Sequence, residues 1–222
     1  RHAETQTQDN LDFILQHESR FEGCEKKFLL NRIVDKDKEN RFLAQLREAG
    51  YAVEVIPHDK KEFLSRSSMQ DRLHYVTNVN AARNHCVDFS LSEGADVVCP
   101  MDGGMFFTNG GWQAFQTIAE ENKNDGFFAF PTWRLVAYED VLDEIIPQFK
   151  SMYNFGETTS YGLTELQLAV TKHADKKFNE DLLYGRADKV ELLYRDTFAG
   201  CHLETRLPTT IIKLGGSTGW KE

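Results

Sequence analysis

The stretch KKFLLNRIVDKDKENRFLAQLREAGYAVEVIPHD, residues 26–59, decides the fold of this chain. It begins with a compact apolar run of strand length, 26–35, and it ends with a second such run, 52–59. Between the two runs, apolar residues recur at helical spacing up to Leu46, and Gly50 is typical of a helix C-terminus. A strand, a helix and a strand of these lengths predict a right-handed crossover that pairs the two strands in parallel.

The same alternation continues up to about residue 140. A polar stretch, 60–75, is expected to be a loop with a helical turn, and the segments after it alternate between helical and strand-like patterns. Helices are expected at 77–95 and 109–125, and strands at 96–102 and 126–138. The order predicts an α/β fold, with a mainly parallel twisted sheet flanked by helices in a single domain over 1–222.

The two ends of the chain do not continue this alternation of strands and helices. A short amphipathic helix is expected within residues 1–26, where Thr7 or Asp9 can act as its N-cap. Beyond Asp140 the pattern predicts three helices and, near the end, one strand; these segments are 141–149, 163–174, 187–195 and 209–214.

Composition excludes several classes of protein. Hydrophobic residues make up 41% and charged residues 27% of the chain, which is ordinary for a packed globular domain. The net charge of -9 removes the usual driving force for binding nucleic acid, and no apolar run approaches the roughly 20 residues that span a bilayer. Four cysteines without a CxxC pair indicate reduced thiols, so we expect a cytoplasmic protein.

Polar side chains follow the ends of the predicted strands. Asn31, Arg32 and Asp35 come after the first strand, and the pair 58–59 ends the second. The strand at 96–102 ends in a lone acid, Asp102, which Gly103 and Gly104 follow. Because ligands of open α/β sheets bind outside the carboxyl ends of the strands, these side chains are expected to face one crevice.

The helix before Asp102 carries a second group of polar residues. Asn80, Arg83 and Asn84 share a face away from the apolar stripe, because positions three and four apart adjoin on a helix. A guanidinium binds phosphate oxygens in pairs, and amides bind sugar hydroxyls, so this face suits a diphosphate. Two plainer interpretations stay open: Arg83 pairs with Asp88 or Asp71 on the surface, and the asparagines only cap and solvate the helix.

Taken in order, these pieces resemble the GT-A superfamily of nucleotide-sugar glycosyltransferases, in particular its bacterial family-two-like members. The resemblance rests on LLNRIVD (29–35), NAARNH (80–85), CPMDGGMFFTNGGW (99–112) and YGRADKVELLYR (184–195). It implies a Rossmann-like GT-A domain that moves a sugar from a nucleoside diphosphate sugar, such as a UDP-sugar, to a glycan or other hydroxyl acceptor. Residues 27–140 would then bind the nucleotide sugar, and 141–222 would form the acceptor side.

The resemblance also implies roles for individual residues. The acceptor hydroxyl would lose its proton to Asp188, or to Glu191 in its place. Asp102 would hold Mn²⁺ or Mg²⁺, and Gly104 stands where the family usually has a second acid. The donor would contact a set of residues drawn from the strand ends and the helix: Asn31, Arg32, Asp35, Asn80, Arg83, Asn84, Asp102 and Gly103.

Two other functions fit parts of the same pattern. A sugar nucleotidyltransferase uses a similar sheet, but it generally has a glycine-rich loop after its first strand, and NRIVDKDKEN (31–40) contains no glycine. A non-catalytic carbohydrate- or protein-binding module of the same fold would explain the glycine at position 104. A measurement of nucleotide-sugar binding, and then of turnover of the bound donor, would distinguish these alternatives.

Overall fold

The computed structural model of the protein describes residues 3–18, 20–107, 109–135, 164–175, 177–182, 201–203 and 211–214. These residues belong to two compact units. The βαβ unit comprises the described residues within Glu22–Gly94 and Lys176–Thr197. The mixed-sheet unit comprises those within Arg1–Phe21, Ala95–Asp175 and Phe198–Glu222. The prediction of a single domain over 1–222 stays a prediction.

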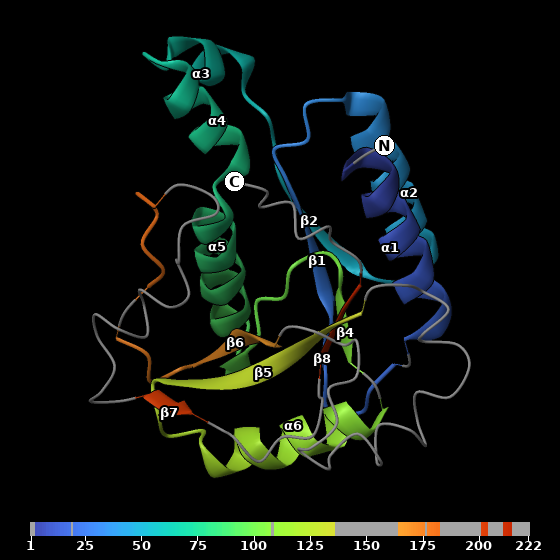
Figure 1. The fold of residues 1–222 in the computed structure, drawn as a ribbon, viewed down its shortest axis with the longest axis vertical. Helices are drawn as coiled ribbons and strands as arrows, with labels where there is room; N and C mark the ends of the chain where they lie inside the picture. The colour runs from blue at the N-terminus through green and yellow to red at the C-terminus, as the bar shows by residue number, and fades with distance from the viewer. Residues whose placement is uncertain are drawn as a thin grey trace. The chain divides into compact units, whose positions relative to one another are not determined.

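The βαβ unit contains the predicted crossover. Strand β1 (Lys27–Asn31) and strand β2 (Ala52–Ile56) pair in parallel and in register, and helix α2 (Lys36–Glu48) connects them (Figure 1). The helix begins where the Asp35 carboxylate accepts hydrogen bonds from the second and third amides of the first turn, and it ends before Gly50, whose φ is 76°. Leu46 anchors the helix, with 1% of its surface exposed. The strand, helix and strand predicted from residues 26–59 are confirmed.

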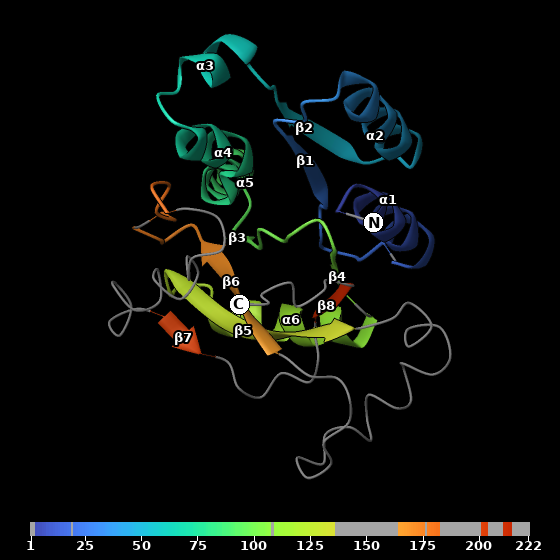
Figure 2. The same ribbon diagram turned by 45° about the horizontal axis from the view of Figure 1, so that its top comes forward.

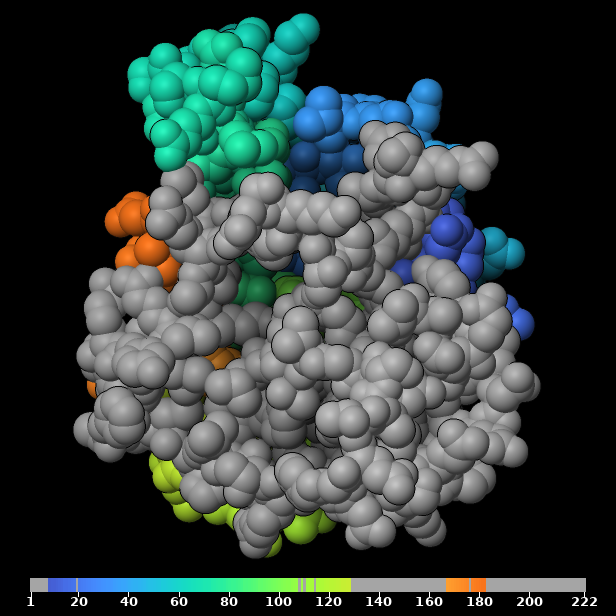
Figure 3. Space-filling model, viewed as in Figure 1, coloured from blue at the N-terminus to red at the C-terminus, as the bar shows by residue number. Residues whose placement is uncertain are grey.

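Three further helices complete the βαβ unit. They are α3 (Lys60–Ser65), α4 (Met69–Thr77) and α5 (Val79–Ser92). Each begins at a side-chain cap, supplied by Asp59, Ser68 and Asn78 respectively. Helices α3 and α4 stand at the surface of this unit (Figure 3), and the expectation of a loop with one helical turn was wrong there. Serine at position 68, three residues before Asp71, forms a capping box, which is the local signal for α4.

The mixed-sheet unit is built around strand β5. Its elements are α1 (Ala3–His17), β3 (Val97–Val98), β4 (Met105–Phe107), α6 (Asn109–Glu121), β5 (Phe127–Leu135), β6 (Thr164–Thr171), β7 (Cys201–Leu203) and β8 (Ile211–Leu214). The strands follow the order β3-β6-β5-β8-β4, with β7 also paired to β5. Strand β5 runs antiparallel to β6 and parallel to β7 and β8, while the β3–β6 and β4–β8 pairs are antiparallel.

The core of this unit lies between α6 and the sheet (Figure 2). Phe115 and Ile118 of α6 pack with residues of β4, β5 and β6, and the rings of Phe115 and Phe128 have centroids 5.7 Å apart. Trp112, on the first turns of α6, stacks on Phe21 at 5.2 Å. The helix expected at 109–125 is therefore confirmed as α6, and its buried residues face the sheet.

Two expectations for the sheet need correction. The described strands form a two-stranded parallel sheet and a six-stranded mixed sheet, so the fold is mixed α/β. The prediction of a mainly parallel sheet is therefore confirmed only in part. Residues 164–171, expected to be helical, form β6, whose last five residues are all buried. The helices expected at 141–149 and 187–195 lie outside the described residues. Among the helices that the structure describes, none is long and apolar enough to cross a bilayer.

Candidate functional site

A pocket of about 480 Å³ opens at the carboxyl ends of β1 and β2, entirely within the βαβ unit. The end of β2, the residue after β1, one face of α5 and one residue beyond β6 line it. The lining residues are Arg32, Val55, Ile56, Pro57, Ala81, Asn84, His85, Asp88 and Glu180. Ligands of open α/β sheets bind outside the carboxyl ends of the strands, and the pocket lies at that edge of the sheet. Of the predicted site residues, Arg32 and Asn84 line the pocket.

Arg32 adopts a left-handed backbone conformation, with φ at 49°, and no other non-glycine residue in the described part of the chain has a positive φ. Such a conformation costs about 1–3 kcal/mol in a residue with a side chain. Two interactions hold it: the Arg32 amide donates to the Ile56 carbonyl at 2.8 Å, and its Nη1 donates to Asn31 Oδ1 at 2.9 Å. Arg32 thus stands just after β1, beside the last residue of β2, and lines the pocket.

Tyr75 of α4 supports Arg32 from within the unit. Its ring lies 4.9 Å from the Arg32 guanidinium, in cation–π contact, and only 5% of the residue is exposed. The Tyr75 hydroxyl accepts a hydrogen bond of 2.9 Å from the amide of Asp59, the N-cap of α3, which joins α4 to the start of α3. Tyr75 was not among the predicted site residues, because the stretch that contains it was expected to be a loop.

Asn84 makes contacts with the protein on both sides of its amide. Its Oδ1 accepts from the Phe178 amide and its Nδ2 donates to the Phe178 carbonyl, each at 2.9 Å. The Nδ2 also donates to Oε1 of Glu180 at 2.8 Å. The asparagine was expected on an exposed helix face, yet it is 5% exposed and fastens residues 177–182 to α5.

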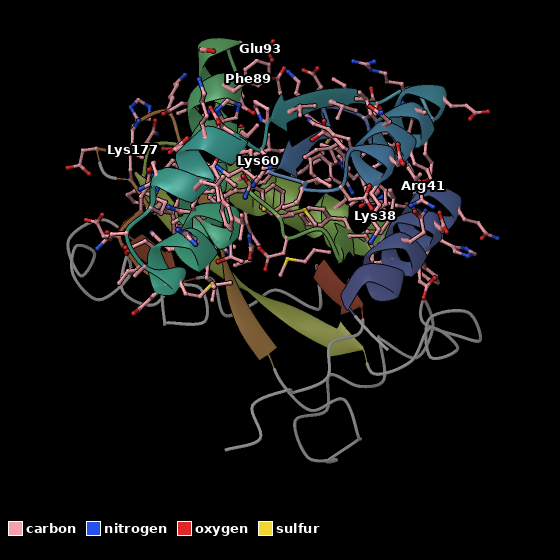
Figure 4. All side chains as sticks on the ribbon, turned by 90° about the horizontal axis from the view of Figure 1, so that it is seen from above. Lys38, Arg41, Lys60, Phe89, Glu93 and Lys177 are labelled. Carbon is pink, nitrogen blue, oxygen red and sulfur yellow. The ribbon has the colours of Figure 1, made fainter. Side chains whose placement is uncertain are left out.

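Asn80 and Arg83 form the buried floor under the same segment. Asn80 donates to the Asn179 carbonyl at 2.7 Å and accepts from Arg83 Nη1 at 3.0 Å. The Arg83 guanidinium lies 5.6 Å from the Phe178 ring. With 2% and 7% exposure, the two residues are not on a solvated face. Asp88 pairs at 2.6 Å with Lys177, which is labelled in Figure 4, and not with Arg83. The contacts of Asn80 and Arg83 explain them as structural residues, which leaves a diphosphate contact of Arg83 as a prediction.

Asn31 and Asp35 lie at the edge of the same unit and serve its backbone. Asn31 accepts from Arg32 Nη1 and has a long contact of 3.5 Å from its Nδ2 to the Asn78 carbonyl. The Asp35 carboxylate caps α2 through hydrogen bonds from the amides of Asp37 and Lys38. Capping accounts for this aspartate without a ligand.

Asp102 and Gly103 belong to the mixed-sheet unit, in the turn between β3 and β4. The Asp102 carbonyl accepts from the Met105 amide at 2.9 Å, and the residue is half-buried. A Cβ added to the exposed Gly103 would have no neighbour within 4 Å, so packing does not require a glycine here. Within the described residues, no group of three or more His, Cys, Asp or Glu side chains could hold a metal ion. A lone Asp102 fits a cation only if the ligand's own phosphates supply further oxygens.

Seven of the nine lining residues were absent from the predicted site, and His85 and Glu180 are among them. His85 directly follows Asn84, and its Nε2 is buried without a hydrogen-bond partner among the described residues. Glu180 sits in a stretch that has no periodicity, so no local pattern could have indicated it. The predicted catalytic residues Asp188 and Glu191 lie outside the described residues.

Comparison with protein-family models and with curated proteins supplies no relative on which to base a function. No protein-family model matches the chain, and no curated protein matches it.

Proposed function

We propose that this protein is a glycosyltransferase whose nucleoside diphosphate sugar binds with its nucleotide in the Arg32 pocket. The observation that carries the proposal is the left-handed conformation of Arg32. A glycine would adopt such a φ without strain, whereas a residue with a side chain is strained there. An arginine at this position therefore indicates a use for its side chain. A guanidinium beside strand ends suits the acceptor oxygens of a nucleotide.

The pocket offers both kinds of hydrogen-bonding group that a nucleotide needs. Arg32 supplies donors, while Glu180 and Asp88 supply acceptors. Val55 and Ile56 give it an apolar edge for a base or ribose face. A volume of about 480 Å³ is within the usual range of about 300–1,000 Å³ for small-molecule sites.

Transfer needs groups beyond the pocket, and these are assigned by the resemblance. The resemblance gives Asp102 the role of holding Mn²⁺ or Mg²⁺, and such an ion would supply Lewis-acid stabilisation of a departing nucleotide. The open space over Gly103 would let the donor approach the backbone. Asp188 would accept the proton of the acceptor hydroxyl, with Glu191 as the alternative.

The test is release of UDP or GDP from a panel of their sugar conjugates, with and without Mn²⁺ or Mg²⁺. We expect at least one donor to be turned over. Asp102→Asn should slow that release on the order of a hundredfold, equivalent to about 3 kcal/mol of barrier, with an unchanged melting temperature. Donor binding without release under every condition would favour the non-catalytic binding module, and failure of all donors to bind would contradict the proposal.

A further inference from the structure

Glu180 is held in place by both its main chain and its side chain. Its carbonyl accepts a hydrogen bond of 2.8 Å from His74 Nε2 and one of 3.0 Å from Asn78 Nδ2. Its carboxylate Oε1 accepts from Asn84 Nδ2 at 2.8 Å. The donors come from α4, from the cap between the helices and from α5, so the residue is fixed against three positions of the same unit.

The residues before Glu180 are secured in the same way. Asn80 and Asn84 hold the carbonyls of Asn179 and Phe178, and the Phe178 side chain is 4% exposed. Ordering a backbone residue costs roughly 1–2 kcal/mol, so a short irregular segment needs such contacts to stay in one conformation. These contacts orient a carboxylate that is itself exposed to solvent at the rim of a pocket.

The Glu180 carboxylate retains hydrogen-bonding capacity. Asn84 occupies Oε1, and no donor to Oε2 is found among the described residues. An ionised carboxylate has about four acceptor positions, so most of them face solvent or a ligand. The other pocket carboxylate, Asp88, already pairs with Lys177. Both carboxylates can therefore accept from a ligand, and Glu180 is the one that no lysine or arginine pairs with among the described residues.

We propose that Glu180 binds the ribose diol of the nucleotide, accepting hydrogen bonds from its 2′- and 3′-hydroxyls. This inference rests on the proposed nucleotide site and adds a residue to it. A carboxylate repels phosphate, whereas a vicinal diol presents two donors that one carboxylate can accept together. Arg32 is the cationic group of the pocket, and it donates hydrogen bonds to the acceptor atoms of the ligand. Asn84 then acts as a positioning residue, because it orients the carboxylate.

The test compares ligands with and without the diol. Calorimetry would measure the binding of UDP, GDP and their 2′,3′-dideoxy analogues to the full chain and to Glu180→Gln, which keeps an acceptor for Asn84. Asp181→Asn, at the exposed neighbouring position, is the matched control. We expect Glu180→Gln to weaken the binding of UDP or GDP about ten- to a hundredfold, the usual range for hydrogen bonds to a charged group. Binding of the dideoxy analogue should change less than about twofold, and Asp181→Asn should bind like the wild type.

Two results would overturn the inference. If Glu180→Gln binds every ligand as the wild type does, or weakens diol and dideoxy ligands equally, the carboxylate does not bind the diol, although the nucleotide site stands. If the wild type binds neither UDP nor GDP, the nucleotide site itself is wrong and the inference falls with it.

Discussion

Asn84 and Phe178 exchange two hydrogen bonds of 2.9 Å, one in each direction, between a side-chain amide and a main chain 94 residues away. The asparagine amide thus acts as a peptide group, pairing with Phe178 as a neighbouring strand would. Only a side chain with both a donor and an acceptor can do this, which excludes aspartate and leucine of similar size. The pairing keeps Glu180 beside the pocket.

The Asn84–Phe178 pairing should be a large contributor to stability. Asn84→Ala leaves a buried amide and a buried carbonyl of Phe178 without partners, each of which costs about 1–3 kcal/mol. We expect the free energy of unfolding in urea to fall by about 2–4 kcal/mol. Asn40→Ala, an exposed asparagine of α2, should stay within about 0.5 kcal/mol of the wild type. Equal urea midpoints of unfolding for the two variants would mean that Asn84 does not hold the segment around Phe178 as described.

Gly103 allows stability and function to be separated. Because the space over Gly103 is open and its φ is not in the left-handed region, Gly103→Ala should leave stability unchanged or raise it by about 0.4–1 kcal/mol. Release of nucleotide should nevertheless fall if the donor lies against this backbone. Gly94→Ala is the opposite control: at a φ of 95° it should lose stability and keep its turnover. A Gly103→Ala variant with full turnover would remove Gly103 from the donor site.

Cys86 should be unreactive at neutral pH. Burial on α5 raises the pKa of its thiol to about 11, from an ordinary value of 9.0. Only the thiolate reacts, so at pH 8 about one molecule in a thousand is competent at this position. The rate of alkylation of Cys86 by iodoacetamide, followed by mass spectrometry, should rise about tenfold for each pH unit from 8 to 10. A plateau near pH 9 in the folded protein would contradict the raised pKa.

Local pattern predicted the βαβ unit well, because its signals are local. The strands around 26–59 are apolar runs of the right length, and Asp35, Asn78 and Gly50 mark helix ends through their own chemistry. The same chemistry also predicted Asp35 as a ligand residue, since a carboxylate after a strand can cap the next helix as readily as it binds a donor. The structure shows the cap, and the donor contact stays a prediction.

Long-range pairing explains where the pattern misled. The sequence of β6 alternates Leu166, Leu168 and Val170 with polar or small residues, yet its apolar residues also suit a helix. Pairing with β5 on one side and β3 on the other decides the outcome, and it buries Gln167, which donates to the Pro100 carbonyl. In the same way, the pairing of Asn84 with Phe178 cannot be inferred from the helix alone. A ligand contact of Asn84 stays a prediction.

Arg32 provides the most direct test of the central claim, that a nucleotide binds at the carboxyl ends of β1 and β2. Glycine adopts a φ of 49° without strain, so Arg32→Gly should keep its stability within about 1 kcal/mol while losing the guanidinium. Arg47→Ala, at an exposed arginine of α2, is the matched control for loss of positive charge.

The measurement is calorimetric titration of the wild type, Arg32→Gly and Arg47→Ala with UDP and with GDP. We predict that one nucleotide binds the wild type and the Arg47→Ala variant equally well, and that it binds Arg32→Gly about ten- to a hundredfold more weakly, as expected for the loss of a charged hydrogen bond. Binding that survives unchanged in a folded Arg32→Gly variant, or no binding of either nucleotide to the wild type, would contradict the account.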